Sequence, residues 1–283
     1  MCACYQLGMQ GAGEFTPAHA LVQADGASPE RWLVILHGIF GSGANWRMLA
    51  RRLCEARPAW GACLVDLRGH GGSIGAPPPH TLDAAADDVL RLEERLGLAV
   101  EGIAGHSFGG KVALAWLARR RRRARRALLL DSSLGLRQGV PNADAVLELL
   151  RRVPQPLPSR ERFVELVRAA GHSKAIADWL AMHVRRAPDG YRLRLDLDAI
   201  GALLADYAGR DLWDVALGPV GTDELDVVVG GRSDVVSPAD RERFAAACAA
   251  NPRVRLHELA GAGHWLHADD PDGLIAVMTG ALA

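Results

Sequence analysis

The chain has 283 residues, of which 49% are hydrophobic and 23% are charged, a composition typical of a globular protein with one large core. Its 33 basic residues balance its 33 acidic residues, so no overall field favours nucleic acid or an anionic membrane. We therefore expect a small neutral molecule as the binding partner, without nucleic acid.

Short runs rich in Val, Ile and Leu recur along the chain and are typical of buried β-strands. They cover residues 32–38, 62–69, 100–107, 126–133, 225–231 and 253–261. Helical patterns lie between several of them, over residues 45–57, 81–96, 108–120, 238–250 and 271–282. This alternation predicts an α/β fold with a mainly parallel, doubly wound sheet that helices cover on both faces.

The alternation is interrupted between about Gly135 and Gly218, where amphipathic helical stretches separated by prolines replace it. These stretches read LELLRRV, RERFVELVRAA and AIADWLAMHVRR. We expect a core of residues 1–134 and 219–283, with residues 135–218 inserted as a helical lid. The insertion follows the fourth strand, so it should lie over the carboxyl ends of the strands, where open α/β sheets bind ligands.

A run of arginines occupies residues 119–126. Cations near the end of a helix interact favourably with its dipole, so we interpret the run as the end of the preceding helix. Neighbouring segments supply no interleaved aromatic residues, which argues against a nucleic-acid site.

Residues 105–109 read Gly-His-Ser-Phe-Gly, between a predicted strand and a predicted helix. This is a G-x-S-x-G elbow, in which a sharp strand-to-helix turn exposes the serine at the end of the sheet. The two glycines keep side chains away from the crowded turn. The pattern predicts Ser107 as a nucleophile.

A serine hydroxyl needs a base that takes its proton, and a histidine is the usual choice. His264 stands at the end of the glycine-rich loop 260–263, just before the last predicted helix, so its ring can reach back over the sheet. We therefore predict His264 as the base, with nearby His267 as a weaker competitor.

A carboxylate should hold the histidine in the correct tautomer and stabilise its charged form. Asp234 follows a predicted strand and lies between serine and histidine in the expected chain order. Asp131 also ends a strand, next to the elbow strand, and satisfies the same order. Asp234 is our first choice, and Asp131 is the alternative.

An acyl-transfer reaction also needs N–H donors for the oxyanion that forms on the attacked carbonyl. The backbone N–H of Phe108, directly after the serine, can supply one. The loop 37–43 can supply another, with Ile39 as first choice and Phe40 as second. A phosphate-binding reading of this loop fails because no G-K-[ST] sequence follows.

Five motifs in order resemble the α/β-hydrolase family: HGIFGSGANW, DLRGHGGS, GHSFGGK, GGRSD and GAGHW. GHSFGGK and the ending GHWLHADDP are similar to the bacterial short-acyl carboxylesterase branch. The resemblance implies a lid over an acyl pocket and no cofactor. Some members of that branch place their acid after the strand that follows the elbow helix, which keeps Asp131 open. Residues 66–71 are similar to a structural turn of the family, and His106 is expected to be structural.

These observations predict a serine hydrolase that cleaves a carboxylic ester or thioester of a small acyl substrate through an acyl-enzyme. Serine at the elbow argues against dehalogenase and epoxide-hydrolase chemistry, which uses aspartate there in this family. Perhydrolase, C–C hydrolase and acyltransferase chemistry, or a noncatalytic ligand-binding role, remain as alternatives. Side chains that can line an acyl pocket are Phe40, Phe108, Trp179, Leu180, Met182 and Trp265.

The cysteines are odd in number and show no metal-ligand spacing, so we expect neither a disulfide framework nor a metal site. They are Cys2, Cys4, Cys54, Cys63 and Cys248. The first 15 residues lack the basic start and apolar stretch of a secretory signal, and no later run reaches the ~20 apolar residues of a membrane span. We expect a cytoplasmic protein, and the sequence does not predict its oligomeric state.

Overall fold

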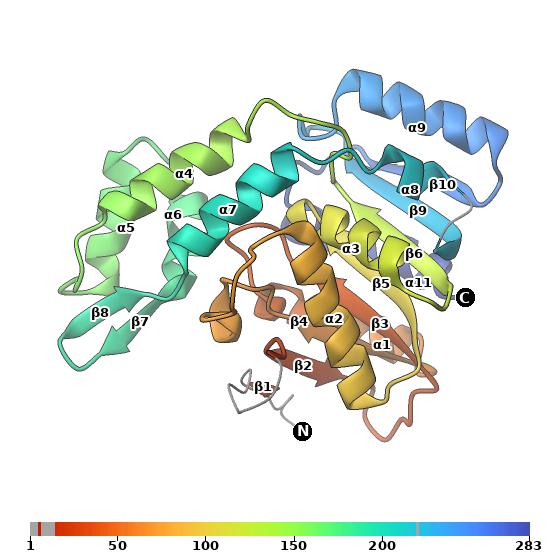
Figure 1. The fold of residues 1–283 in the computed structure, drawn as a ribbon, viewed down its shortest axis with the longest axis horizontal. Helices are drawn as coiled ribbons and strands as arrows, with labels where there is room; N and C mark the ends of the chain where they lie inside the picture. Colours follow the sequence, from red (N-terminus) through yellow and green to blue (C-terminus); the bar gives the residue numbers. More distant parts are fainter. Residues whose placement is uncertain (1–4, 7–14, 219–220) are drawn as a thin grey trace.

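The computed structural model describes residues 5–6, 15–218 and 221–283. An eight-stranded sheet in the order β1-β2-β4-β3-β5-β6-β9-β10 forms its centre (Figure 1). The parallel strands are β3 (Arg31–Leu36), β4 (Trp60–Val65), β5 (Val100–His106), β6 (Ala124–Leu130), β9 (Thr222–Gly230) and β10 (Val254–Leu259). All six predicted strands are present, and the expected mainly parallel α/β fold is confirmed.

One edge of the sheet was not predicted. β2 (His19–Val22) pairs antiparallel with β4, and β1 (Tyr5–Gln6) pairs antiparallel with β2. These strands are only four and two residues long, too short to show a clear period in the sequence.

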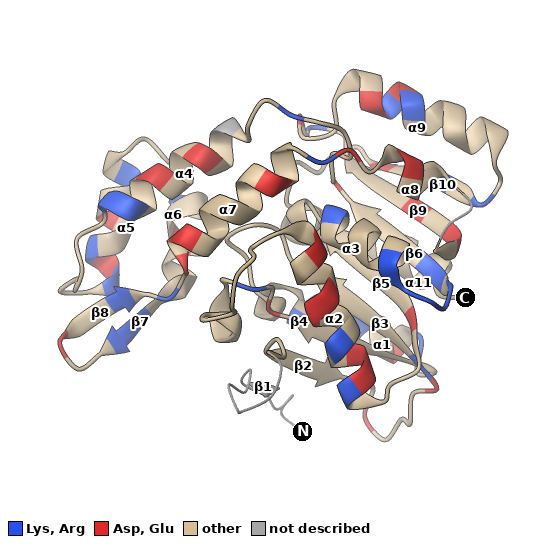
Figure 2. Cartoon of the chain, viewed as in Figure 1, with Lys and Arg blue, Asp and Glu red and all other residues tan. Residues whose placement is uncertain are grey.

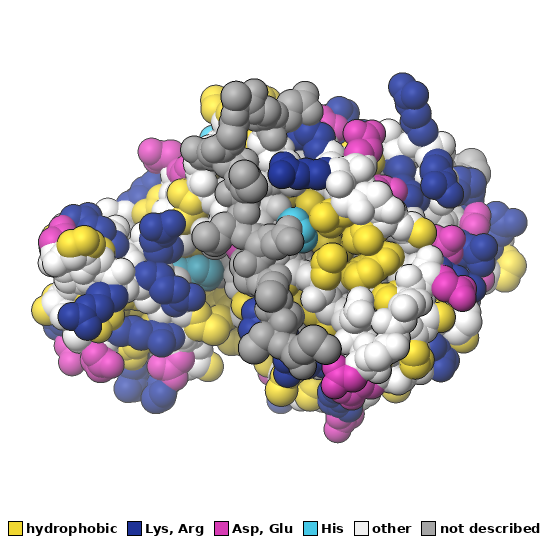
Figure 3. All heavy atoms as spheres, turned by 90° about the horizontal axis from the view of Figure 1, so that it is seen from below, with side chains coloured by type: hydrophobic (Ala, Val, Ile, Leu, Met, Phe, Trp, Pro, Cys, Tyr) yellow, Lys and Arg dark blue, Asp and Glu magenta, His cyan; other side chains and the backbone are white. Residues whose placement is uncertain are grey.

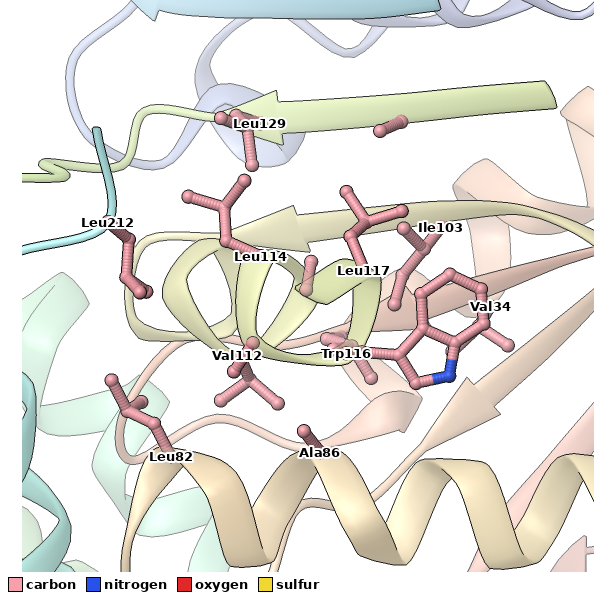
Figure 4. Close-up of a cluster of buried hydrophobic side chains, with 14 of the residues drawn as sticks. Val34, Leu82, Ala86, Ile103, Val112, Leu114, Trp116, Leu117, Leu129 and Leu212 are labelled. Atoms are coloured by element: carbon pink, nitrogen blue, oxygen red, sulfur yellow. The ribbon is translucent and has the colours of Figure 1, made fainter. Parts of the chain in front are cut away.

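Two buried clusters, one on each face of the sheet, form the core of the sheet domain. On one face lie α2 (Leu82–Leu96), α3 (Phe108–Arg119), α8 (Trp213–Leu217) and α9 (Pro238–Ala250). On the other lie α1 (Arg47–Ala56), which follows the short helix η1 (Gly43–Trp46), and α11 (Pro271–Ala281). Figure 4 shows Trp116 and Leu117 of α3 near Ile103 of the sheet, and Val112 facing Leu82 of α2. Residues alternate between the two faces along each strand, as a sheet covered on both sides requires.

The predicted insertion, residues 135–218, contains α4 (Pro141–Arg152), α5 (Arg160–Ala169), α6 (Lys174–Leu180) and α7 (Leu197–Ala208), whereas α8 at its end packs with the sheet domain. Figure 1 shows α4, α5 and α6 beyond one end of the sheet. Buried side chains of these elements, among them Leu150, Phe163 and Leu180, form a third cluster. This cluster also includes Phe40 of the loop after β3, so it joins these helices to the sheet domain.

The predicted helix AIADWLAMHVRR is wrong in its second half. The helix ends at Leu180. The chain then passes through η3 (Ala181–His183) and forms β7 (Val184–Ala187), which pairs with β8 (Gly190–Leu193). The turn between these strands is Pro-Asp-Gly, and Gly190 has a φ of 139° that favours glycine. This turn signal was present in the sequence and overrides the helical period.

The arginine run is divided between two elements. Only Arg119 lies in the last turn of α3, so the interpretation as a helix end holds for that residue alone. Most of the run forms ion pairs: Arg119 with Asp87, Arg120 with Glu93, Arg123 with Asp223, Arg125 with Glu101, and Arg126 with Glu224. The positive charge of this segment is therefore largely neutralised by carboxylates.

Cys2 and Cys4, and nearly all of the N-terminal stretch in which no signal is expected, lie outside the described residues. Cys54, Cys63 and Cys248 have free thiols. Across residues 15–218 and 221–283, no helix has the length and apolarity needed to cross a bilayer.

Lys111, one turn into α3, is fully buried. Its Nζ donates to the carbonyl oxygens of Gly135 at 2.8 Å, Tyr207 at 2.8 Å and Arg210 at 2.6 Å. Burial lowers the pKa of Lys111 to about 8, so the amine still holds its proton at neutral pH. One ammonium group thus holds both ends of the insertion against the elbow helix.

Lys111→Met should lower the free energy of unfolding by about 3 kcal/mol, because three carbonyl oxygens lose their donor. Urea unfolding followed by tryptophan fluorescence measures the loss. The chain's other lysine, Lys174, is exposed and pairs with Asp178, so Lys174→Met is a matched control with an expected loss below about 0.5 kcal/mol. Equal losses in the two variants would show that Lys111 does not anchor the insertion.

Candidate functional site

Ser107 lies at the turn between β5 and α3, with φ of 53° and ψ of −117°. The turn is crowded, because a Cβ on Gly105 would lie 2.2 Å from the carbonyl oxygen of Gly109. A Cβ on Gly109 would lie 2.6 Å from the carbonyl oxygen of His37. Only glycine fits at both positions, so the strand and the helix hold Ser107 in its strained conformation. Within the described part of the chain, Ser107 Oγ makes no hydrogen bond.

Backbone strain is concentrated around this serine. Among the described residues, the only non-glycine residues with positive φ are Phe40 at 57°, Ser107 at 53° and Asp131 at 46°. They follow β3, β5 and β6, three neighbouring strands of the sheet. Such conformations cost about 1–3 kcal/mol each and cluster at functional sites.

His264 makes its side-chain hydrogen bond to Asp131, with 2.7 Å between Nδ1 and Oδ2. Asp131 is fully buried, whereas the His264 side chain is 32% exposed. The same carboxylate also accepts from the backbone N–H of Gly230 at 3.0 Å and from the hydroxyl of Ser233. These contacts fix the carboxylate, which in turn orients the imidazole.

Asp234, the first-choice acid, is not the partner of His264 in the described structure. It is exposed and lies at the wall of the cavity in front of Ser107. The loop after β9 turns Ser233, rather than Asp234, toward Asp131. The geometry therefore favours the alternative acid, Asp131.

The backbone donors near Ser107 differ in availability. The N–H of Phe40 is already donated to Nε2 of His70, at 3.1 Å. The N–H groups of Ile39 and Phe108 make no hydrogen bond with the described residues. Ile39 and Phe108 are thus available to an oxyanion, and Phe40 is not.

Three histidines that sequence reasoning did not single out hold the loop after β3. His37 donates from Nδ1 to Gly38 O at 2.7 Å, and its Nε2 accepts from the N–H of Leu67 at 2.9 Å. His70 donates from Nδ1 to the carbonyl oxygen of Arg68, as well as accepting from Phe40. His183 of η3 donates from Nε2 to the carbonyl oxygen of Phe40 at 2.7 Å. Phe40 is therefore held at both its N–H and its C=O, once by the core and once by the insertion.

Both His37 and His70 must be neutral, because each accepts a backbone N–H at Nε2. Burial lowers the pKa of His37 to about 4 and that of His70 to about 3. In the sequence, His70 was visible only as part of a turn thought to be structural, and His183 only as a residue of a predicted helix.

The two other histidines beside His264 have different roles. His106 is buried, its Nε2 donates to the carbonyl oxygen of His264 at 2.8 Å, and burial lowers its pKa well below the usual value. His267 packs on Trp46 with 4.7 Å between ring centroids, and burial lowers its pKa to about 4. Neither forms a hydrogen bond with an acid in the described part of the chain, as His264 does.

A cavity of about 680 Å3 lies in front of Ser107, within the usual size range of small-molecule sites. Four of the side chains predicted to line a pocket line it: Phe40, Phe108, Trp179 and Trp265. The rings of Trp179 and Trp265 lie 5.4 Å apart, so the insertion meets the segment around His264 across this cavity. Met182 lines a different cavity, and Leu180 is buried within the insertion. Among the described residues, no group of three or more His, Cys, Asp or Glu side chains is arranged to hold a metal ion.

A sequence profile of the alpha/beta hydrolase family matches residues 33–277. A sn-1-specific diacylglycerol lipase, ABHD11 of Danio rerio, is 26% identical over 262 residues, 90% of this chain and 80% of the relative. Esterase YbfF of Escherichia coli (strain K12) is 26% identical over 252 residues, 86% of this chain and 89% of the relative. Among solved structures, a marine microorganism esterase superposes with a TM-score of 0.79 at 24% identity, covering 94% of this chain and 99% of that chain.

The neutral histidines should make stability depend on pH. The folded pKa of His70 is about 3 against a usual 6.5, so below pH 6.5 the unfolded chain binds the additional proton. The free energy of unfolding should therefore fall as pH drops below 6.5, by up to about 1.4 kcal/mol per pH unit for each such histidine.

In His70→Gln, the side-chain carbonyl can still accept from Phe40, but the group does not titrate. Urea unfolding between about pH 4.5 and 7 should give a shallower pH dependence for this variant than for the unmodified protein. Parallel curves for the two proteins would contradict the assignment of His70 as a neutral acceptor.

Proposed function

Because the chain belongs to the alpha/beta hydrolase family, we propose that it is a serine esterase that cleaves a carboxylic ester or thioester through an acyl-enzyme on Ser107. The relatives named as an esterase and a lipase support ester hydrolysis. The strongest support is the hydrogen bond between His264 and buried Asp131, at the cavity that the free hydroxyl of Ser107 also lines.

The mechanism follows from the direction of the hydrogen bonds. Asp131 accepts from Nδ1–H of His264, which leaves Nε2 unprotonated and able to take the proton of Ser107. Ser107 Oγ then attacks the acyl carbonyl, and the N–H groups of Phe108 and Ile39 bind the oxyanion. His264 returns the proton to the leaving alcohol or thiol. Water, activated by the same histidine, releases the acid from the acyl-enzyme.

The insertion, residues 135–218, is proposed as the lid of this site, on a core of residues 1–134 and 219–283. Its side chains, including Val146, Ile176 and Trp179, form one wall of the cavity. An apolar wall suits the hydrocarbon part of an acyl group and excludes water from the acyl-enzyme.

Ser107→Ala should lower kcat/KM for p-nitrophenyl butyrate by about 10⁴-fold or more and leave the circular dichroism spectrum unchanged. A fluorophosphonate probe should label the unmodified protein and not this variant. Absence of labelling in the unmodified protein would instead favour a noncatalytic ligand-binding protein. Full esterase activity of Ser107→Ala would remove the nucleophile assignment.

The two candidate acids can be separated with one pair of isosteric variants. Asp131→Asn should lower kcat by about 10³–10⁴-fold, because the amide favours the wrong histidine tautomer. Asp234→Asn, at an exposed position on the same cavity, should change kcat less than about threefold. The reverse order of the two losses would restore Asp234 as the acid.

A further inference from the structure

A second cavity, of about 1080 Å3, lies beside the first, between the start of α1 and the β7–β8 hairpin of the insertion. Its walls are rich in arginine, although the whole chain has no net charge. Figure 2 shows basic residues along β7 and β8, and Figure 3 shows Lys and Arg side chains crowded over the same end of the molecule. We call this cavity the arginine groove.

Most of these arginines lack a carboxylate partner within the described chain. The ones without an ion pair are Arg47, Arg51, Arg160, Arg185, Arg186 and Arg194. Arg192 pairs with Asp189. The groove arginines without an ion pair thus differ from the arginine run at 119–126, where carboxylates neutralise most side chains.

Among the described residues that line the groove, the only carboxylate is Asp66, and it is not available to the arginines. Asp66 is buried, and its two oxygens accept from the N–H groups of Gly43 and Gly72, each at 2.8 Å. Nε of Arg47 is buried and has no hydrogen-bond partner among the described residues. A buried donor without a partner and several unpaired guanidinium groups together favour an anionic ligand.

The arginine groove adjoins the proposed catalytic cavity. Asn45 lines both cavities. His183, which also lines the groove, donates to the carbonyl oxygen of Phe40 on the wall of the first cavity. The arginines therefore lie next to the cavity at Ser107, on the side of Asn45 and of the Phe40–His183 contact.

We propose that the arginine groove binds phosphate groups on the leaving-group side of the substrate. Guanidinium groups match phosphate oxygens in paired hydrogen bonds, whereas the aromatic cavity suits the acyl part. The preferred substrates are then acyl esters or thioesters whose alcohol or thiol bears phosphate, rather than the neutral substrate suggested by the net charge. This inference rests on the proposed esterase function for the position of the scissile bond.

Two thioesters with the same acyl group test the proposal: butyryl-coenzyme A, which bears phosphates, and butyryl-N-acetylcysteamine, which bears none. The unmodified protein should prefer the phosphate-bearing thioester at least tenfold in kcat/KM, mainly through KM. In the double variant Arg185→Gln, Arg186→Gln, that preference should fall about tenfold or more. Arg253→Gln is the matched control, because Arg253 is exposed, has no ion pair with the described residues and precedes β10 at the opposite end of the strands. This variant should keep the preference.

Binding of inorganic pyrophosphate to Ser107→Ala, measured by calorimetry, tests the groove without catalysis. It should occur and weaken in the arginine double variant made in the same background. If Ser107→Ala keeps its p-nitrophenyl esterase activity, the proposed function is wrong. The pyrophosphate measurement still tests whether the arginine groove binds phosphate.

Equal kcat/KM for the two thioesters in the unmodified protein would overturn the proposal. A preference that survives in the arginine double variant would overturn it too. Vesicles containing phosphatidylglycerol distinguish a lipid headgroup from a substrate phosphate. Retention on these vesicles that depends on Arg185 and Arg186, without binding of pyrophosphate, would assign the groove to a membrane surface and reject the substrate proposal.

Discussion

The close contact between strand β5 and helix α3 constrains the rest of the site. Because Gly105 lets β5 approach the backbone of Gly109, and Gly109 lets α3 approach the end of β3, the helix starts directly after Ser107 with the N–H of Phe108 unused by the described residues. One turn later, Lys111 binds both ends of the insertion. A single helix therefore positions the proposed nucleophile, one proposed oxyanion donor and the segment proposed as the lid.

Charge is distributed around this helix in two ways. Next to the loop after β3, burial keeps His37 and His70 neutral, so they act as fixed hydrogen-bonding groups that hold Phe40 and its neighbours. Such preorganised groups need no rearrangement when charge develops on a substrate. In the arginine groove the opposite holds, because uncompensated positive charge remains where the insertion faces α1. Asn45 lines both the apolar cavity in front of Ser107 and the cationic arginine groove.

Local patterns were enough to predict the six parallel strands and the strand-to-helix turn at Ser107, but not the short edge strands β1 and β2. Strand and helix periods are properties of short segments, and the G-x-S-x-G turn needs residues that are adjacent in the chain. The choice between Asp131 and Asp234 depends instead on how the loop after β9 turns, and that loop is fixed by contacts between distant residues. The positions of Met182 and His183 also could not be predicted from local pattern, because the β7–β8 hairpin follows them where a helix was expected to continue. The hydrogen bond that occupies the N–H of Phe40 likewise comes from a distant residue, His70, 30 positions away.

The anchoring of the insertion by Lys111 also bears on how such a protein can diversify. Gly135 and Arg210 reach the same ammonium group, so the chain leaves and re-enters the sheet domain at one point. The entropy of closing a loop rises only slowly with its length, and a segment of different size can start and finish there at little cost. A change in the length of the segment between Gly135 and Arg210 therefore leaves these two points of attachment in place. A replacement segment would still need a donor for the carbonyl oxygen of Phe40, as His183 now supplies.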